Sequence, residues 1–339
     1  MDTMLGFSRI KKGYYTGIGK KVEIADLAKA LEVPAADLEP NYKTDDNVHG
    51  IRRSYLEAQA MLYAQKKQWD ICRHFLALLI FGVILLPKKA EYVDHDAIHV
   101  FTSFRVSDVD PTPTILANIY YTIHTRCEKK RGMLFCCVHL LYSWLTSHIY
   151  KANYLVKDLT RHEWSQKLRA LKADSIFWYA RKQNYERIIY KCGDFPNVPL
   201  IGTLGCINYN PVLALRQLGH SMDDEPSKQQ VEELILHDMG KGDPRTLKKV
   251  IQAWKSVQTK KFGPKNVIAK EPYTRWGQER VGRILLPFIV DPVLEHAGVE
   301  IANWKRYYEQ ASRDKKESEE NLETMIFELT IGPRIKRGK

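Results

Sequence analysis

The stretch FPNVPLIGTLGCINYNPVLALRQLG, residues 195–219, is the most sharply punctuated part of this 339-residue chain. Gly202 and Gly205 stand three residues apart in an apolar loop, where the missing side chains permit close backbone approach. The backbone clamp of a KH module also uses paired glycines, but this loop contains no basic residue. We therefore interpret the loop as a point of tight packing.

A short helix is predicted directly after this loop. Asn210 is a natural N-cap, and Pro211 fits the first helical position, which needs no amide donor. Gly219 is placed to end the helix in a left-handed conformation. The residues between these ends are mostly apolar, so we expect the helix to be buried on most sides.

The composition predicts a chain with a large core and no membrane span. Apolar residues make up 44% of the sequence, enough to fill a sizeable core. The longest apolar run, residues 75–86, falls short of the roughly twenty residues that a bilayer span needs. The six cysteines and an N-terminus without a signal-like apolar core favour reduced thiols. We expect a nuclear or cytoplasmic protein with no membrane partner.

The charge balance points to polyanions as one class of partner. The formal net charge is +12, from 52 basic and 40 acidic residues, and such a charge attracts nucleic acid in a salt-dependent way. Candidate contacts are the clusters Lys129-Lys130-Arg131 and Lys260-Lys261. The alternative is that these residues are ordinary solvated surface, because sequence does not place them on one face. Protein partners are the other class that we expect.

The apolar spacing predicts a mainly α fold: a multi-helix globular domain with at most a few short strands near residues 188–204. We expect three parts. Residues 1–21 form a basic flexible N-terminus, and residues 22–290 form the helical core. Residues 291–339 form a basic helical tail with heptad-like spacing, for which a coiled coil and self-association are expected alternatives.

Several helices in the core are predicted from their ends and faces. Residues 114–127 and 134–145 form two apolar stripes joined by a short turn, so we predict a helical hairpin around a shared core. A further helix is predicted after Pro226, up to His237. Asp243 followed by proline starts another, with Leu247, Ile251 and Trp254 on one face.

One pair of side chains has the spacing of a metal site. His95 and His99 stand one helical turn apart, as do paired histidines in helical zinc sites. The metalloprotease pattern wants glutamate where Asp96 stands, and no third ligand is evident nearby. We therefore expect a packed or surface histidine pair, with metal as the alternative. No catalytic set and no cofactor are predicted.

The central stretch also closely resembles the signature of a plant domain of unknown function that is similar to the plant mobile domain, sometimes labelled aminotransferase-like. Further matching segments are residues 78–82, 92–94, 116–122, 128–132, 136–137 and 276–287. The signature residues are Phe195, Pro196, Asn197, Pro199, Gly202, Gly205, Asn208, Tyr209, Asn210, Pro211, Arg216 and Gly219. The resemblance covers residues 22–287.

The resemblance implies a largely helical, retroelement-associated protein with no established catalysis and with nuclear roles. It supplies no catalytic residues, and nothing here singles out a Schiff-base lysine. Relatives have a longer segment before the equivalent of Val22, which suggests a truncated copy.

Two hypotheses follow from these observations. The first is a non-enzymatic, retroelement-derived domain that contacts protein or nucleic acid. The alternative is a metal-dependent hydrolase that uses His95 and His99.

Overall fold

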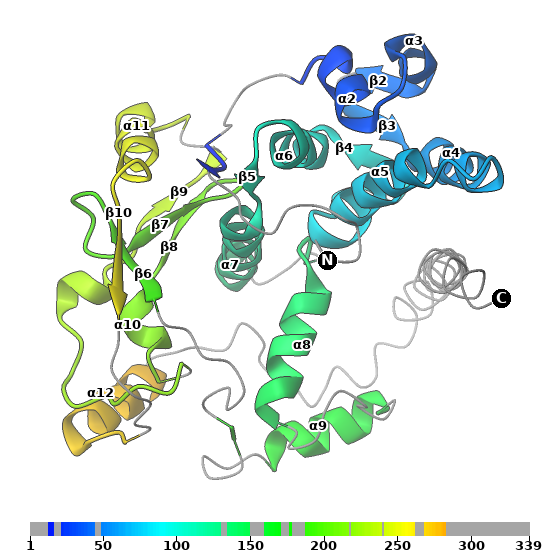
Figure 1. Ribbon diagram of the computed structural model, residues 1–339. Helices are drawn as coiled ribbons and strands as arrows, with labels where there is room; N and C mark the ends of the chain where they lie inside the picture. The colour runs from blue at the N-terminus through cyan, green and yellow to red at the C-terminus, as the bar shows by residue number, and fades with distance from the viewer. Residues whose placement is uncertain are drawn as a thin grey trace, which may run out of the picture.

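The protein is described by a computed structural model that covers residues 13–16, 22–44, 49–129, 134–149, 159–170, 176–177, 187–216, 218–238, 241–261 and 268–282. Figure 1 shows helices and small sheets mixed along this part of the chain. In chain order the elements are β1 Gly13–Tyr14, α2 Ile24–Leu31, α3 Ala35–Leu38, η1 Glu39–Asn41, β2 Tyr42–Thr44, β3 His49–Arg52, α4 Arg53–Gln65, α5 Trp69–Leu79, the π-helix η2 Ile80–Leu85, β4 Tyr92–Asp94, α6 His95–Val106, β5 Val109–Asp110, α7 Thr112–Lys129, α8 Val138–Ile149, α9 Arg161–Arg169, β6 Arg187–Cys192, β7 Val198–Ile201, β8 Cys206–Tyr209, α10 Pro211–Ala214, η4 Lys228–Val231, β9 Ile235–Leu236, α11 Pro244–Ala253, β10 Val257–Lys261 and α12 Glu271–Gly282.

The prediction of a mainly α fold is wrong, because the chain is mixed α/β. Its described strands form four small sheets, with orders β1-β5, β10-β6, β2-β3-β4 and β7-β8-β9. Strands β6 and β7 lie where short strands were expected, but the others do not. Each sheet contains at least one pair of strands that are distant in sequence, and strands of two to six residues are too short to show clear alternation.

The larger core lies in the N-terminal half, where α2, α4, α5, η2 and α6 pack together. Phe81 sits edge-on to Phe101 and tilted against Phe104, with centroid separations of 5.6 and 5.4 Å, a geometry that aromatic rings favour. Gly82 lies against Val93 of β4 so closely that an added Cβ would meet the valine side chain at 2.4 Å. Tyr15, within the segment expected to be flexible, is buried in this core.

A second core lies between the β7-β8-β9 sheet and α11 (Figure 1). Trp254 follows α11, packs into this core and donates its Nε1–H to the carbonyl oxygen of Pro199 at 2.7 Å. Cys192 and Cys206 also lie here, and burial raises the pKa of each thiol to about 12. The helix predicted from Asp243 is confirmed as α11, and the Asp243 carboxylate accepts from the Thr246 amide at 3.0 Å.

Helix α7 belongs to both cores. Ile115 and Ile119 pack in the N-terminal core, whereas Ala117 packs in the C-terminal one. Because residues two apart on a helix point to opposite sides, α7 can hold one core on each face. Figure 1 shows it between α6 and the β7-β8-β9 sheet.

The predicted hairpin of α7 and α8 shares a core only in part: Leu141 of α8 packs against the N-terminal core, as do Ile119 and Ile123 of α7. Only Ile149 of α8 is buried, while Leu134, Val138 and Trp144 are exposed. The apolar stripe of α8 was correctly located, but a stripe alone does not say which surface covers it. Figure 1 shows α8 extending away from α7 toward α9.

Residues 211–237 also differ from expectation. The helix after Asn210 ends at Ala214, although Pro211 holds the first position and Gly219 has a φ of 87° as predicted. The helix expected up to His237 is wrong: this segment forms the 3₁₀ turn η4 and the strand β9, which pairs with β8. The tail expected at residues 291–339 lies outside the described residues.

Candidate functional site

The signature loop packs against α7 through its two glycines. A Cβ on Gly202 would lie 2.4 Å from Asn118 Oδ1 of α7, and one on Gly205 would lie 2.5 Å from Tyr121 Cε2 of α7 and 2.4 Å from the Leu236 carbonyl oxygen of β9. The loop then bonds to α7 twice: the Thr203 amide donates to Asn118 Oδ1 at 2.8 Å, and Asn118 Nδ2 donates to Thr203 Oγ1 at 2.9 Å. These buried contacts join the two cores.

Other signature side chains fix the hairpin locally. Asn197 and Asn208 both donate to the carbonyl oxygen of Glu232, at 3.4 and 2.8 Å. Asn210 stands at the N-cap of α10, but its side chain makes no capping bond. Phe195 and Tyr209 pack at the edge of the second core. The remaining members are half-buried or buried: Pro196, Pro199, Pro211, Arg216 and Gly219. The contacts of the signature are those of a packing centre.

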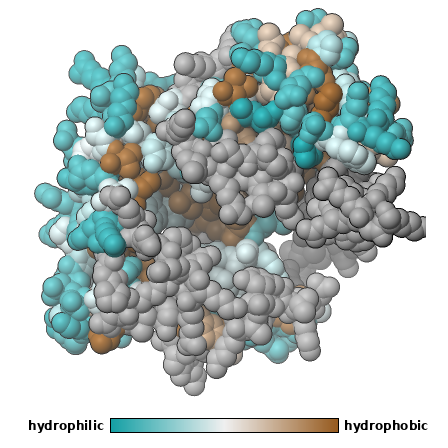
Figure 2. Space-filling view, viewed as in Figure 1, coloured by the Kyte–Doolittle hydropathy of each residue, from teal (hydrophilic) through white to brown (hydrophobic). Residues whose placement is uncertain are grey.

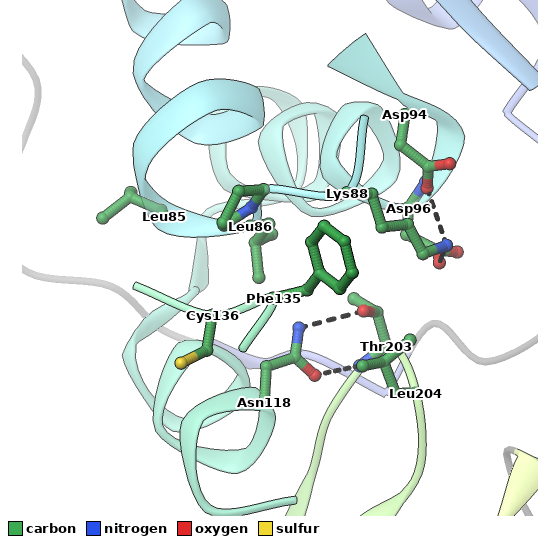
Figure 3. Close-up of a pocket in the computed structure, with 11 residues that line it drawn as sticks. Leu85, Leu86, Lys88, Asp94, Asp96, Asn118, Phe135, Cys136, Thr203 and Leu204 are labelled. Carbon is green, nitrogen blue, oxygen red and sulfur yellow. Dashed lines mark hydrogen bonds and ion pairs between the residues drawn. The ribbon is translucent and has the colours of Figure 1, made fainter. Parts of the chain in front are cut away.

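A small cavity lies beside this loop (Figure 3). Lys88 lies in its wall, with its ammonium 2.9 Å from the Asp94 carboxylate and 2.5 Å from that of Asp96. Asn118 and Thr203 line the other side, together with Leu85, Leu86, Pro87, Phe135, Cys136 and Leu204. The cavity has room for about one water molecule, so it does not fit an organic substrate.

The chemistry of Lys88 is that of a structural ion pair. Burial alone would lower the pKa of Lys88, but the Asp96 and Asp94 carboxylates outweigh burial and raise it. An amine with a raised pKa stays protonated at neutral pH, and a protonated amine is no nucleophile. The cluster ties the end of β4 and the start of α6 to the loop that follows η2.

The histidine pair His95 and His99 lies on α6, and each ring is bonded by a tyrosine. The Tyr42 hydroxyl lies 3.1 Å from His95 Nδ1, and the Tyr15 hydroxyl lies 3.0 Å from His99 Nδ1. The two imidazole centroids are 6.5 Å apart. Among the residues that the structure describes, no group of three or more His, Cys, Asp or Glu side chains forms a metal-binding cluster. Metal at the pair stays a prediction.

A basic surface forms on α11 and β10. Between Lys241 and Lys261 the chain has seven basic residues and one acidic residue, Asp243. All seven basic residues are exposed: Lys241, Arg245, Lys248, Lys249, Lys255, Lys260 and Lys261. We call this set the α11–β10 surface. Figure 2 shows hydrophilic residues along the left-hand edge, where α11 and β10 lie in Figure 1.

The structure explains why these side chains face outward. Leu247, Val250 and Ile251 pack into the second core, so Arg245, Lys248 and Lys249 occupy the opposite side of α11. Strand β10 then pairs antiparallel with β6 as a two-stranded ribbon. Gln258, Thr259, Lys260 and Lys261 are exposed along it.

The ribbon combines positive charge with an aromatic ring. Lys260 Nζ lies 5.2 Å from the centroid of the Tyr190 ring on β6, within cation–π distance. The two strands contain basic residues and no Asp or Glu. Nucleic-acid-binding surfaces use the same residue types, because lysine neutralises phosphate and an aromatic ring can stack on a base.

The predicted clusters fall on different elements. Lys260 and Lys261 are the last residues of β10, and Lys129 is the last residue of α7 and exposed. Lys130 and Arg131 lie outside the described residues. Sequence reasoning missed the other five members of the α11–β10 surface, although the apolar face that it found on α11 implies a basic face opposite.

Residues 1–282 match the family model of the Domain of unknown function (DUF7745). The chain belongs to the DUF7745 family. The match ends at the last residue of α12 and includes the signature, both cores and the α11–β10 surface. The further similarity of this DUF7745 domain to the plant mobile domain stays a prediction.

Comparison of the DUF7745 chain with curated proteins and with solved structures finds no match. Within the described segments, no helix combines the length and the apolar character needed to cross a membrane. The site must therefore be interpreted from its own chemistry.

Proposed function

We propose that this chain is a non-enzymatic, retroelement-derived domain that binds nucleic acid in the nucleus, and that the α11–β10 surface makes the contact. The observation that supports the proposal most is the local charge. Seven exposed basic residues stand against one aspartate between Lys241 and Lys261, a net +6 that is half of the chain's formal +12.

The shape of this surface supports backbone contact with a nucleic acid. The ribbon of β6 and β10 has exposed lysines at its end, and two-stranded ribbons are narrow enough to enter a major groove. Helix α11 directly precedes β10 in the chain, and its exposed face adds three more basic side chains. Phosphate contacts of this kind give affinity without base specificity.

Binding is tested with the full chain and fluorescent 20-nucleotide DNA and RNA, single- and double-stranded, by anisotropy from 50 to 300 mM NaCl. We expect binding at low salt that weakens steeply as salt rises. Each phosphate of duplex DNA that the protein neutralises contributes about 0.9 to the slope of the logarithm of the association constant against the logarithm of the salt concentration. Comparison of the four ligands identifies the preferred nucleic acid.

The contact residues are tested by replacing Lys248, Lys249, Lys260 and Lys261 with alanine together. This variant should lose at least tenfold in affinity at low salt and show a slope smaller by roughly three to four units. Lys29→Ala with Lys89→Ala, which removes two charges at exposed positions far along the chain, is the control and should bind like the parent. No binding at 50 mM NaCl, or an unchanged slope in the fourfold variant, would contradict the proposal.

A further inference from the structure

The ribbon of β6 and β10 has a β-bulge at Tyr190, the only aromatic residue of these two strands. Its neighbours Ile189 and Lys191 pair with consecutive residues of β10, so Tyr190 is the extra residue of the bulge. Ile189 and Cys192 both pack in the second core. Because a bulge redirects side chains, the two residues between them, Tyr190 and Lys191, lie on the other face of the ribbon.

A chain of hydrogen bonds holds the Tyr190 ring in place. Gln230 Nε2 donates to the Tyr190 hydroxyl at 2.9 Å. Gln230 is itself fixed by a capping box at the start of η4, where its Oε1 accepts from the Ser227 amide and its own amide donates to Ser227 Oγ. The orientation of the ring is therefore set before a ligand arrives, and this lowers the entropy cost of stacking on it.

The surroundings of the ring are basic. Lys260 Nζ lies 5.2 Å from the ring centroid, and the ribbon also contains Lys191 and Lys261. A base stacked on Tyr190 would have its own phosphates next to these ammonium groups. Lys260 is exposed and has a flexible stem, so its ammonium can move from the ring to a phosphate when a base takes its place.

We propose that the ligand of the α11–β10 surface is a single-stranded nucleic acid, and that Tyr190 stacks on one of its unpaired bases. This inference rests on the nucleic-acid binding proposed above and adds the class of strand. A duplex offers phosphates to the lysines, but its bases already stack on one another. An unpaired base offers its face to the ring, and such stacking tolerates any sequence because every base has a π-face.

The parent chain tests the proposal with three fluorescent 20-nucleotide DNA ligands: a single strand of mixed sequence, the duplex of that sequence, and a single strand made only of stable abasic residues. The abasic strand carries the same phosphates and no bases. At 150 mM NaCl, anisotropy should show the mixed single strand bound roughly fivefold or more tighter than the abasic strand, the size expected for stacking on one base. It should also bind more tightly than the duplex.

Tyr190→Leu should abolish the preference for bases, because it removes the ring and keeps an apolar side chain. Its affinity for the mixed single strand should fall to that for the abasic strand. The dependence of binding on salt should stay unchanged, since no phosphate contact is lost. Tyr190→Phe keeps the ring and loses only the hydroxyl that Gln230 bonds, so it should retain the preference.

Tyr92→Leu is the matched control. Tyr92 lies on β4, in a different sheet, and Lys43 Nζ lies 5.9 Å from its ring centroid. It is thus an equivalent lysine–tyrosine pair away from the ribbon, and its replacement should leave all three affinities unchanged. Circular dichroism shows whether each variant keeps the parental fold.

Three results would overturn the proposal: equal affinity of the parent for the mixed and abasic strands, tighter binding of the duplex, or a folded Tyr190→Leu that keeps the parental preference. In each case nucleic-acid binding through the lysines would still stand, because the fourfold lysine variant tests it separately. Absence of binding to all three ligands even at 50 mM NaCl would instead contradict the proposed function, and this inference with it.

Discussion

At the scale of single residues, the room left by neighbouring atoms explains why the signature has glycine at Gly202 and Gly205. Gly202 and Gly205 are not among the described glycines with positive φ, which are Gly50, Gly193 and Gly219. The first two therefore need glycine because neighbouring atoms leave no room for a Cβ. Gly219 needs it for its left-handed backbone. One stretch of sequence thus uses glycine for two separate physical reasons.

Replacement of Gly202 by alanine should lower the free energy of unfolding by about 1–3 kcal/mol, because its Cβ would collide with Asn118 Oδ1. Gly277 provides the matched control. It lies within α12, and nothing stands within 4 Å of its Cβ position. Gly277→Ala should therefore raise stability, by up to about 1 kcal/mol. Urea denaturation measures both, and a neutral Gly202→Ala would show that the loop can move aside.

At the scale of elements, sequence patterns located a helix reliably where the helix buries one long apolar face. Helices α7 and α11 have a long apolar stripe or a clear cap, and their positions were predicted. The strands were mostly missed, since β2, β4 and β9 are two or three residues long, and β4 and β9 pair with strands far away in the sequence. Sequence also found the apolar face of α11 but drew no conclusion from the basic face opposite.

A histidine connects three of these elements. His74 on α5 is buried, its Nδ1 lies 3.4 Å from the Leu31 carbonyl oxygen at the end of α2, and its Nε2 lies 2.9 Å from Arg105 Nη2 on α6. A carbonyl only accepts and a guanidinium only donates, so these contacts require the neutral ring with its proton on Nδ1. Arg105 also pairs with Glu32 at 3.0 Å.

The stability of the protein should fall as pH drops below about 6.5, in part through His74. Burial, then the Arg105 charge, lowers the pKa of His74 in the folded protein. The unfolded chain therefore binds more protons as pH falls through the unfolded value, and the stabilisation present above it is lost. His74→Gln should show a smaller loss of thermal stability between pH 7.5 and 5.5 than the parent. An equal loss in both proteins would exclude His74 as a contributor.

At the scale of the whole molecule, α7 joins two cores that differ in composition. The N-terminal core is built mostly from helices, and the C-terminal one from a three-stranded sheet and α11. Asn118 and Thr203 hold the joint with two buried hydrogen bonds. Coupling between the halves therefore depends on a few polar contacts as well as on apolar packing.

Asn118→Ala should lower the free energy of unfolding by about 2 kcal/mol, because it leaves the Thr203 amide buried without its acceptor. It should also broaden the transition or split it in two, as the halves become less coupled. Gln252→Ala, at an exposed position on α11, should change neither. Urea unfolding followed by far-UV circular dichroism and tryptophan fluorescence measures both effects; a single unshifted transition for Asn118→Ala would contradict this view of the joint.

The sequence by itself determined the local features of this protein: the glycine loop, the proline start of α10, the left-handed stop at Gly219, the main helices and the basic excess. These depend on backbone sterics and periodicity, which neighbouring residues fix. Only the tertiary structure decided the mixed α/β class, the exposure of α8, and the outward position of all seven basic residues of the α11–β10 surface. Each of these depends on which distant segment covers which face, and that is settled by pairing and burial across the chain.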